Sequence, residues 1–150
     1  MRTLFLGLLL LGSTSLAATA QVSPSAKPAK PLDRQTYNLH AGENKVGYAQ
    51  AVLVGKTLHI SGTVSQGSTM AEQVEGIYKV FEKTLAHHGL TFQHVVRENV
   101  YATDLTAFTQ QIELRKNYYN GIYPAATWME IKRLLMPNAL VEIEMTAVKP

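Results

Sequence analysis

The sequence predicts one α+β domain in which two helices cover one face of a mixed β-sheet. Three observations lead to this fold class. Two short β-rich runs, residues 49–54 and 57–61, are joined by Gly55-Lys56, which is typical of a tight hairpin. Residues 69–89 have the caps and the apolar spacing of a helix. Residues 140–148 alternate between polar and apolar side chains, which indicates a strand.

The first half of the domain contains the hairpin and one long helix, with a further strand expected near residues 37–40. The helix begins with a capping box, Thr69-x-x-Glu72, and ends at Gly89. Its apolar stripe consists of Val74, Ile77, Tyr78, Phe81 and Leu85. This spacing places the stripe on the side that faces the sheet.

The second half contains three strands and a second helix. Residues 95–102 are predicted to form a strand, and Asp104 to cap a helix that ends just before Gly121. Residues 128–134 and 140–148 are predicted as the last two strands. The complete order is therefore β-β-α-β-α-β-β.

The face of the sheet that the helices leave uncovered is expected to be apolar. This expectation rests on Val52, Val54, Leu58 and Ile60. An exposed apolar sheet face is normally buried against another protein chain, so the sequence predicts an oligomer.

Two carboxylates of the last strand are candidates for chemistry. Alternation places Glu142 and Glu144 on the same face. Neighbouring carboxylates on a sheet repel each other, so both persist only where solvent or hydrogen-bond donors stabilise them. One of them is a candidate to hold a water molecule for addition to an electrophile, and the alternative is a pair of solvated surface charges.

Residues 1–20 have the anatomy of a cleavable secretory signal peptide. Arg2 precedes an apolar run at residues 4–12, and Ala18-Thr19-Ala20 matches the small-x-small pattern that is cut after Ala20. The run is shorter than the roughly 20 residues that span a bilayer, so no membrane association is expected after cleavage. An uncleaved signal anchor or an ordinary first helix is the alternative. The prediction is a periplasmic or secreted protein.

The mature chain is expected to begin with a solvated linker. Residues 21–35 hold three of the six prolines and few large apolar side chains, a composition that cannot bury enough surface to fold. The folded domain is therefore predicted to span residues 36–150.

The composition excludes several classes of function. The 150-residue chain has no cysteine, which removes disulfides, thiolate metal sites and cysteine nucleophiles. The 14 Lys and Arg residues against 11 Asp and Glu are scattered, so no nucleic-acid partner is expected. No phosphate-binding loop, nucleophile elbow or metal-ligand spacing is present, so neither a metal nor a cofactor is predicted.

Three stretches of the chain form an ordered set of motifs. They are Gly47-Tyr48-Ala49-Gln50-Ala51-Val52 with Val54-Gly55-Lys56 and Ile60-Ser61-Gly62, then residues 99–105 with Phe108, then Tyr123-Pro124-Ala125-Ala126-Thr127 with residues 130–134 and 139–144. Their combination resembles the RidA/YjgF family of reactive-intermediate deaminases, and the resemblance covers about residues 44–148.

The resemblance implies a chorismate-mutase-like fold and a homotrimer with small-molecule sites in three clefts between protomers. Active members hydrolyse enamines and imines to a keto acid and ammonia without a cofactor. The family's cleft tyrosine matches Tyr48, its water-placing glutamate matches Glu142, and backbone contacts after its Ser-Gly step match Gly62 and Thr63.

The chain departs from the family at the arginine that binds the substrate carboxylate. Ala126 stands in that position, followed by Thr127 and by the bulky Trp128, so these three residues are expected to line the cleft. Alternative cations are Arg97, Arg115 and Arg133. The favoured interpretation is a protein that binds a small molecule without standard 2-imino acid deaminase activity. The alternative is an enamine or imine hydrolase with an altered substrate preference.

A third alternative is RNA cleavage, an activity claimed for some relatives. The sequence has neither a basic stripe nor an interleaved aromatic platform to support it.

Overall fold

The computed structural model describes residues 30–150, and residues Leu32–Pro150 form one compact unit. The predicted signal peptide and most of the predicted linker lie outside the described residues. The elements, in chain order, are β1 (Gln35–Tyr37), α1 (Gly42–Val46), β2 (Ala51–Val54), β3 (Thr57–Thr63), α2 (Met70–His87), the 3₁₀ turn η1 (Phe92–His94), β4 (Val95–Ala102), α3 (Leu105–Thr109), α4 (Ile112–Tyr119), β5 (Ala125–Glu130) and β6 (Val141–Val148).

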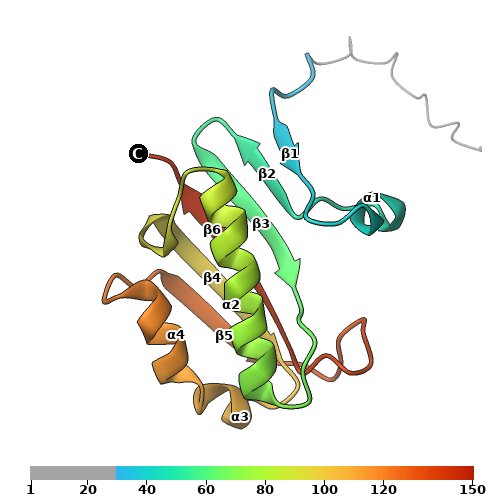
Figure 1. The fold of residues 1–150 in the computed structure, drawn as a ribbon, viewed down its shortest axis with the longest axis vertical. Coiled ribbons are helices and arrows are strands. Elements are labelled where there is room, and N and C mark those ends of the chain that lie inside the picture. Colours follow the sequence, from blue (N-terminus) through green and yellow to red (C-terminus); the bar gives the residue numbers. More distant parts are fainter. Residues whose placement is uncertain (1–29) are drawn as a thin grey trace, which may run out of the picture. The chain divides into compact units, whose positions relative to one another are not determined.

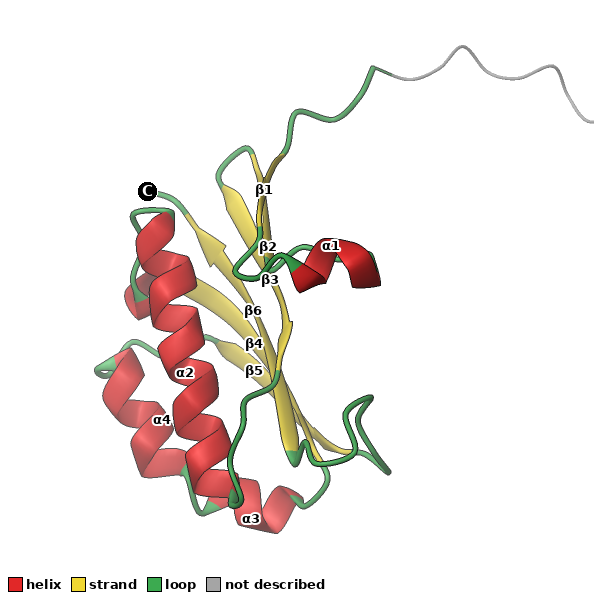
Figure 2. Cartoon of the chain, turned by 45° about the vertical axis from the view of Figure 1, so that its right-hand side comes forward, coloured by secondary structure: helices red, strands yellow, loops and turns green. Residues whose placement is uncertain are grey.

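The strands form one mixed sheet in the order β1-β2-β3-β6-β4-β5 (Figure 1). The pair β4–β5 is parallel and the other pairs are antiparallel. Helices α2, α3 and α4 lie on one side of the sheet (Figure 2). The predicted α+β class, with helices on one face of a mixed sheet, is confirmed.

Local sequence signals set the hairpin and the long helix as predicted. Gly55 has a φ of 57°, the left-handed conformation that the tight β2–β3 turn requires. The Thr69 side chain accepts a hydrogen bond from the Glu72 backbone, and the Glu72 side chain accepts one in return, which completes the capping box of α2. The short β1 corresponds to the extra strand expected near residues 37–40, whereas α1 was not predicted.

The second predicted helix is interrupted. Asp104 caps it as expected, accepting a hydrogen bond from the Ala107 backbone at 2.8 Å. The helix then stops at Thr109, because the Gln111 N–H bonds to the Phe108 carbonyl three residues back and tightens the turn. Helix α4 resumes after this turn.

The fifth strand lies earlier in the chain than predicted. The sequence indicated residues 128–134, but β5 spans Ala125–Glu130. The reason is its partner: β4 ends at Ala102, which pairs with Glu130, so no strand continues beyond that point for residues 131–134 to join.

The expectation of an apolar uncovered face is wrong. In the hairpin, Leu58 pairs with Leu53, and both are buried on the helix side of the sheet together with Ile60. Val52 pairs with the exposed His59 on the other side. Because paired residues of a hairpin share a face, the predicted set mixed the two faces. We call the side away from α2–α4 the open face.

No helix among residues 30–150 is both long enough and apolar enough to cross a membrane.

Candidate functional site

The open face carries polar side chains in rows across the strands. The alternation predicted for β6 is confirmed, because its buried and half-buried residues alternate along the whole strand. Read from β6 through β4 to β5, the rows are Thr146–Arg97–Ala125, Glu144–Asn99–Thr127 and Glu142–Tyr101–Met129. Glu142 and Glu144 thus lie on the same face, as the sequence predicts.

A pocket at one end of this face brings together Tyr48, Gly62 and Glu142. It has a volume of about 320 Å³ and lies where β3 and β6 meet the segment before β2. The other residues that line it are Val46, Ser61, Val64, Leu135 and Met136. We call it the Glu142 pocket.

A buried carboxylate fixes the turn that carries Tyr48. Gly47, with a φ of 97°, ends α1 in the left-handed conformation and directs the chain to Tyr48. The buried Glu43 holds both sides of this turn by accepting hydrogen bonds from backbone N–H groups. These donors are Leu39, His40 and Gln50, at 3.2, 2.9 and 3.1 Å. The position of Tyr48 is therefore set by satisfied backbone bonds.

A β-bulge brings Gly62 against Glu142. Strand β3 pairs Ile60 with Met145 and Thr63 with Ile143, so β3 advances one residue more than β6 between the two pairs. Such an extra residue kinks a strand and re-aims its neighbours. A Cβ atom at Gly62 would overlap the Glu142 Oε1 atom, so this approach requires glycine.

The two glutamates of β6 have different partners. Glu144 Oε1 accepts hydrogen bonds from Asn99 Nδ2 at 2.7 Å and from the Tyr101 hydroxyl at 3.0 Å. Within residues 30–150, no protein group donates a hydrogen bond to the half-buried Glu142. Burial raises the pKa of Glu142, and the charge of Glu144 raises it further. Glu142 is therefore the carboxylate that can hold a water molecule or exchange a proton.

Tyr48 lines the Glu142 pocket together with this carboxylate. Its pKa is raised, first by burial and then by the negative charges of Glu43 and Glu142. Tyr48 therefore remains a neutral hydroxyl that can donate a hydrogen bond.

Thr63 lies beside Gly62 but has a structural hydroxyl. Its side chain is buried, accepts a hydrogen bond from Gln50 Nε2 at 2.9 Å and donates one to the Ser61 carbonyl at 3.0 Å. Only its backbone is left to contact a ligand.

The other three predicted site residues lie on β5, away from the Glu142 pocket. In the sheet, β6 and β4 separate β5 from β3 (Figure 1). Ala126 pairs with the fully buried Glu98 of β4. Thr127 lies on the open face, where its hydroxyl accepts a hydrogen bond from Arg97 at 3.3 Å. A single chain therefore does not unite Ala126, Thr127 and Trp128 with Glu142.

Trp128 faces the helices. Its ring meets Phe108 edge-on, with 5.4 Å between ring centroids, and the Arg115 guanidinium carbon lies 5.4 Å from its centre. Arg115 donates to Glu98 at 2.7 Å. This alternative cation is thus paired inside the fold.

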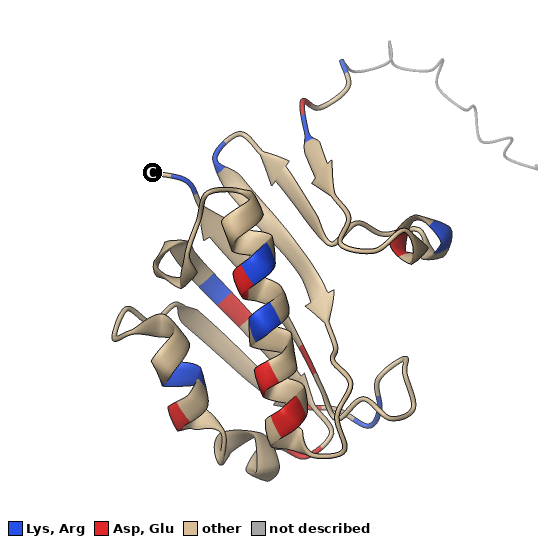
Figure 3. Ribbon diagram, in the orientation of Figure 1, with Lys and Arg blue, Asp and Glu red and all other residues tan. Residues whose placement is uncertain are grey.

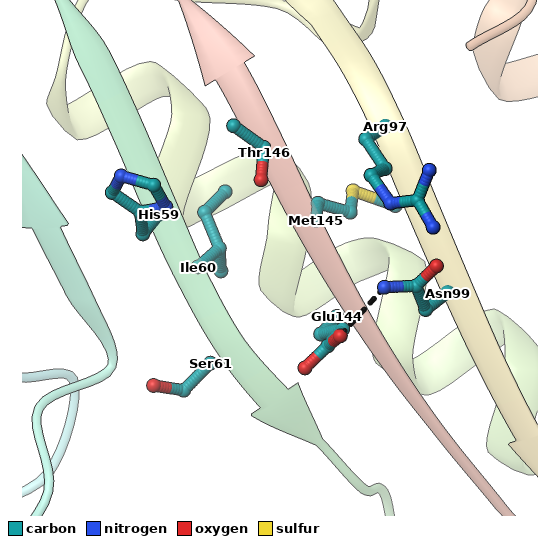
Figure 4. Close-up of a pocket in the computed structure, with 8 residues that line it drawn as sticks. All are labelled: His59, Ile60, Ser61, Arg97, Asn99, Glu144, Met145 and Thr146. Atoms are coloured by element: carbon teal, nitrogen blue, oxygen red, sulfur yellow. Dashed lines mark hydrogen bonds between the residues drawn. The ribbon is translucent and has the colours of Figure 1, made fainter. Parts of the chain in front are cut away.

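A second hollow, of about 270 Å³, lies on the open face, and Arg97 is one of the residues that line it (Figure 4). Its lining includes Asn99 and Glu144, whose hydrogen bond Figure 4 shows. Sequence reasoning missed the donors Asn99 and Tyr101. In the sequence, Val100 and Ala102 on either side of Tyr101 show part of this alternation, but the charged Glu98, which is buried, interrupts it.

In the described part of the chain, the arrangement of charged and metal-ligating side chains indicates neither a metal site nor a basic stripe. Lys and Arg are spread over helices, strands and loops and interleaved with Asp and Glu (Figure 3). No three His, Asp or Glu side chains of residues 30–150 are grouped so that they could hold a metal ion.

Comparison with known proteins decides the family. A family model described as Endoribonuclease L-PSP matches residues 39–149. The chain belongs to the RidA/YjgF family. This member is 33% identical over 111 residues to a RutC family protein of Aquifex aeolicus, covering 68% of this chain and 88% of that protein. It is 28% identical over 110 residues to the human 2-iminobutanoate/2-iminopropanoate deaminase, covering 68% of this chain and 80% of the human protein.

Solved structures of the RidA/YjgF family share the fold. A YjgF/YER057c/UK114 family member from Mycobacterium tuberculosis superposes with a TM-score of 0.73 at 30% identity, covering 78% of this chain and all (100%) of that one. A YjgF family member from Neisseria meningitidis gives a TM-score of 0.69 at 27% identity, covering 79% and 97%. The resemblance and the chorismate-mutase-like fold predicted from the sequence are confirmed.

Proposed function

We propose that this RidA/YjgF protein binds a small molecule in a cleft between protomers and lacks standard 2-imino acid deaminase activity. The observation that carries the proposal is Ala126, which stands where the resemblance places a carboxylate-binding arginine. Residues 122–130, which include all of β5, contain no Lys or Arg. Alanine offers none of the N–H donors of a guanidinium. Losing such a charged partner typically costs about 2–5 kcal/mol, or roughly 30- to several-thousand-fold in binding.

Two separate groups of exposed apolar side chains support a homotrimer. The first borders the Glu142 pocket and consists of Val46, Tyr48, Leu135 and Met136. The second lies on or just before β5 and consists of Ile122, Tyr123 and Met129. Contact between two different patches is heterologous, and it closes into a ring when the rotation from one protomer to the next closes. In such a ring, β5 of one protomer would complete the Glu142 pocket of the next.

The oligomer is tested by light scattering during size-exclusion chromatography. The expected mass is three times that of the mature chain, and Leu135→Glu in the first apolar group should reduce it. A monomeric wild-type protein would contradict the proposed cleft.

An enamine or imine hydrolase with an altered substrate preference is the second candidate. Glu142 favours it, because a half-buried carboxylate with a raised pKa and no protein donor suits a general acid–base that positions water. Tyr48 in the same pocket supplies a hydroxyl for the substrate or the water. Hydrolysis of this kind requires no cofactor.

One assay separates the two candidates for amino-acid-derived imines. An amino-acid oxidase generates 2-imino acids in the presence of semicarbazide, which traps them as semicarbazones. We expect wild-type protein to leave semicarbazone formation unchanged and Ala126→Arg to reduce it. Ala125→Arg, on the neighbouring β5 residue and the opposite sheet face, is the matched control and should have no effect. A reduction by wild-type protein would disprove the claim that Ala126 disables this reaction.

We also propose export to the periplasm or the medium after cleavage of the signal peptide. Mass spectrometry of the protein from its native host should show a chain that begins at Gln21, whereas a chain that retains residues 1–20 would contradict this proposal.

A further inference from the structure

We infer that the cleft at Glu142 selects cationic ligands with an apolar substituent, such as iminium ions or amines, and rejects carboxylates. This inference rests on the proposed function, because it names the ligand class of the same cleft. It follows from three features: the charge of the pocket, the positions of the nearby cations and the apolar rim.

The Glu142 pocket is negatively charged. Among its described lining residues, Glu142 is the one with an ionisable acid or base, apart from the phenol of Tyr48. Glu144 follows two residues later on the same face, and the buried Glu43 lies beneath the turn that carries Tyr48. A ligand carboxylate would meet these negative charges in a partly desolvated site, whereas a cation would be attracted by them.

Within one protomer, two of the three candidate arginines, Arg97 and Arg115, lie away from the pocket, and the third, Arg133, is exposed on the segment that leads to Leu135. The Arg115 guanidinium is buried and paired with Glu98 on the helix side of the sheet. Arg97 lies in the row of Thr146, four residues from Glu142 along β6, which corresponds to about 13 Å of strand. Arg97 contacts Thr127 and lines the separate hollow shown in Figure 4.

The rim of the pocket is apolar. The side chains of Val46 and Leu135 are 72% and 83% exposed, and Met136 lies beside them in the pocket lining. In the proposed ring this rim would face β5 of the next protomer, so an apolar group of the ligand could be buried between the two protomers. The complementary ligand therefore has a cationic nitrogen for Glu142 and an apolar group for this rim.

The same preference is compatible with hydrolysis. An iminium ion R₂C=NH₂⁺ and water give R₂C=O and NH₄⁺. A C–O bond forms as water adds to the carbon, the C–N bond breaks, and the nitrogen leaves with the electron pair of that bond. Glu142 accepts a proton from the attacking water and returns it to the departing nitrogen, and the remaining hydroxyl proton passes to the released ammonia to give NH₄⁺. The ligand carboxylate of a 2-imino acid has no role in this sequence.

The inference is tested with three shape-matched probes: benzylammonium, benzyl alcohol and benzoate. Isothermal titration calorimetry is performed on the mature wild-type protein at slightly alkaline pH, where the carboxylate and the ammonium are both charged. We expect benzylammonium to bind at least about tenfold more tightly than benzyl alcohol, as for a hydrogen bond between charged groups, and benzoate to bind most weakly. Glu142→Gln should remove the advantage of the cation.

Two further variants make the test decisive. Glu113→Gln removes an exposed carboxylate of α4 that pairs with Lys116, and it should leave the preference unchanged. If benzoate binds as tightly as benzylammonium, or if Arg97→Gln abolishes benzoate binding, the inference is wrong. It is also wrong if none of the probes binds to the wild-type protein. The semicarbazide assay tests the proposed function separately, since it measures turnover of 2-imino acids and not probe affinity.

Discussion

Two carboxylates on opposite faces of the same sheet have opposite surroundings. Glu98, under the helices, is fully buried and accepts hydrogen bonds from Arg115 at 2.7 Å, Tyr78 at 2.7 Å and Tyr119 at 2.6 Å. Glu142, on the open face, is half-buried and accepts none from residues 30–150. Glu98 is therefore both buried and supplied with donors, whereas Glu142 is half-buried and has no donor among the described residues.

The ionisation of the groups around Glu98 reinforces this difference. Burial and the Glu98 charge raise the pKa of Tyr78 and of Tyr119, so both remain protonated donors. Burial lowers the pKa of Arg115, but Glu98 outweighs it and the net pKa is raised, so the guanidinium stays charged. The three donors to Glu98 therefore stay protonated, whereas the pKa of Glu142 is raised by burial and by the charge of Glu144.

The largest expected effect comes from breaking the Glu98 network. Glu98→Ala leaves the Arg115 charge buried without its partner, which typically costs about 3–5 kcal/mol in the free energy of unfolding. Urea unfolding measures this cost through the fluorescence of Trp128, the single tryptophan. Glu142→Ala is the comparison on the open face and should cost less than about 1 kcal/mol. Equal losses for the two variants would contradict the proposed difference.

A matched pair of tyrosine variants sharpens the comparison. Tyr119→Phe removes a donor from the buried Glu98 and should cost about 1.5–3 kcal/mol, the usual range for a hydrogen bond to a charged group. Tyr101→Phe removes a donor from Glu144, which is half-buried and keeps Asn99 on the same oxygen. We expect a cost below about 1 kcal/mol in the same urea experiment. A larger loss for Tyr101→Phe than for Tyr119→Phe would show that the open face is the more tightly bonded side.

The parts of the fold that the sequence predicted are those with local causes. The capping box of Thr69 and Glu72, the turn at Gly55 and the alternation of β6 depend on neighbouring residues, and all three are confirmed. The bounds of β5 depend on where β4 ends, a contact between distant segments. The faces of Leu58 and Ile60 were assigned wrongly because they depend on hairpin register.

The candidate site was predictable only in part. Tyr48, Gly62 and Glu142 came from the family resemblance, and the structure places them around one pocket. The carboxylate that fixes the Tyr48 turn, Glu43, has no sequence motif, because its partners are backbone N–H groups. The pairing of Ala126 with Glu98 also had no local signal, since it joins two strands that α3 and α4 separate in the chain.

A methyl group at Gly62 should impair the open-face site more than the fold. In Gly62→Ala the new Cβ overlaps the Glu142 carboxylate, which must move because the rigid β3 backbone cannot. We expect at least a roughly tenfold loss of benzylammonium affinity, as for loss of a charged hydrogen bond. Gly42→Ala is the matched control, because its Cβ would meet no atom within 4 Å. Unchanged affinity in Gly62→Ala would mean that Glu142 does not contact the probe.

The smallest effect tests the influence of Glu144 on Glu142. Burial is the larger cause of the raised Glu142 pKa and the Glu144 charge the smaller, so Glu144→Gln should lower that pKa only part of the way to the ordinary glutamate value. A carboxyl with a raised pKa binds more protons in the folded state, so the free energy of unfolding decreases as pH rises from the ordinary value to the raised one. This decrease should become smaller in the variant.

Carbon-13 NMR titration of the glutamate side chains measures the Glu142 midpoint directly, and Glu113→Gln should leave it in place. A midpoint unaffected by Glu144→Gln would mean that burial alone sets the pKa of Glu142.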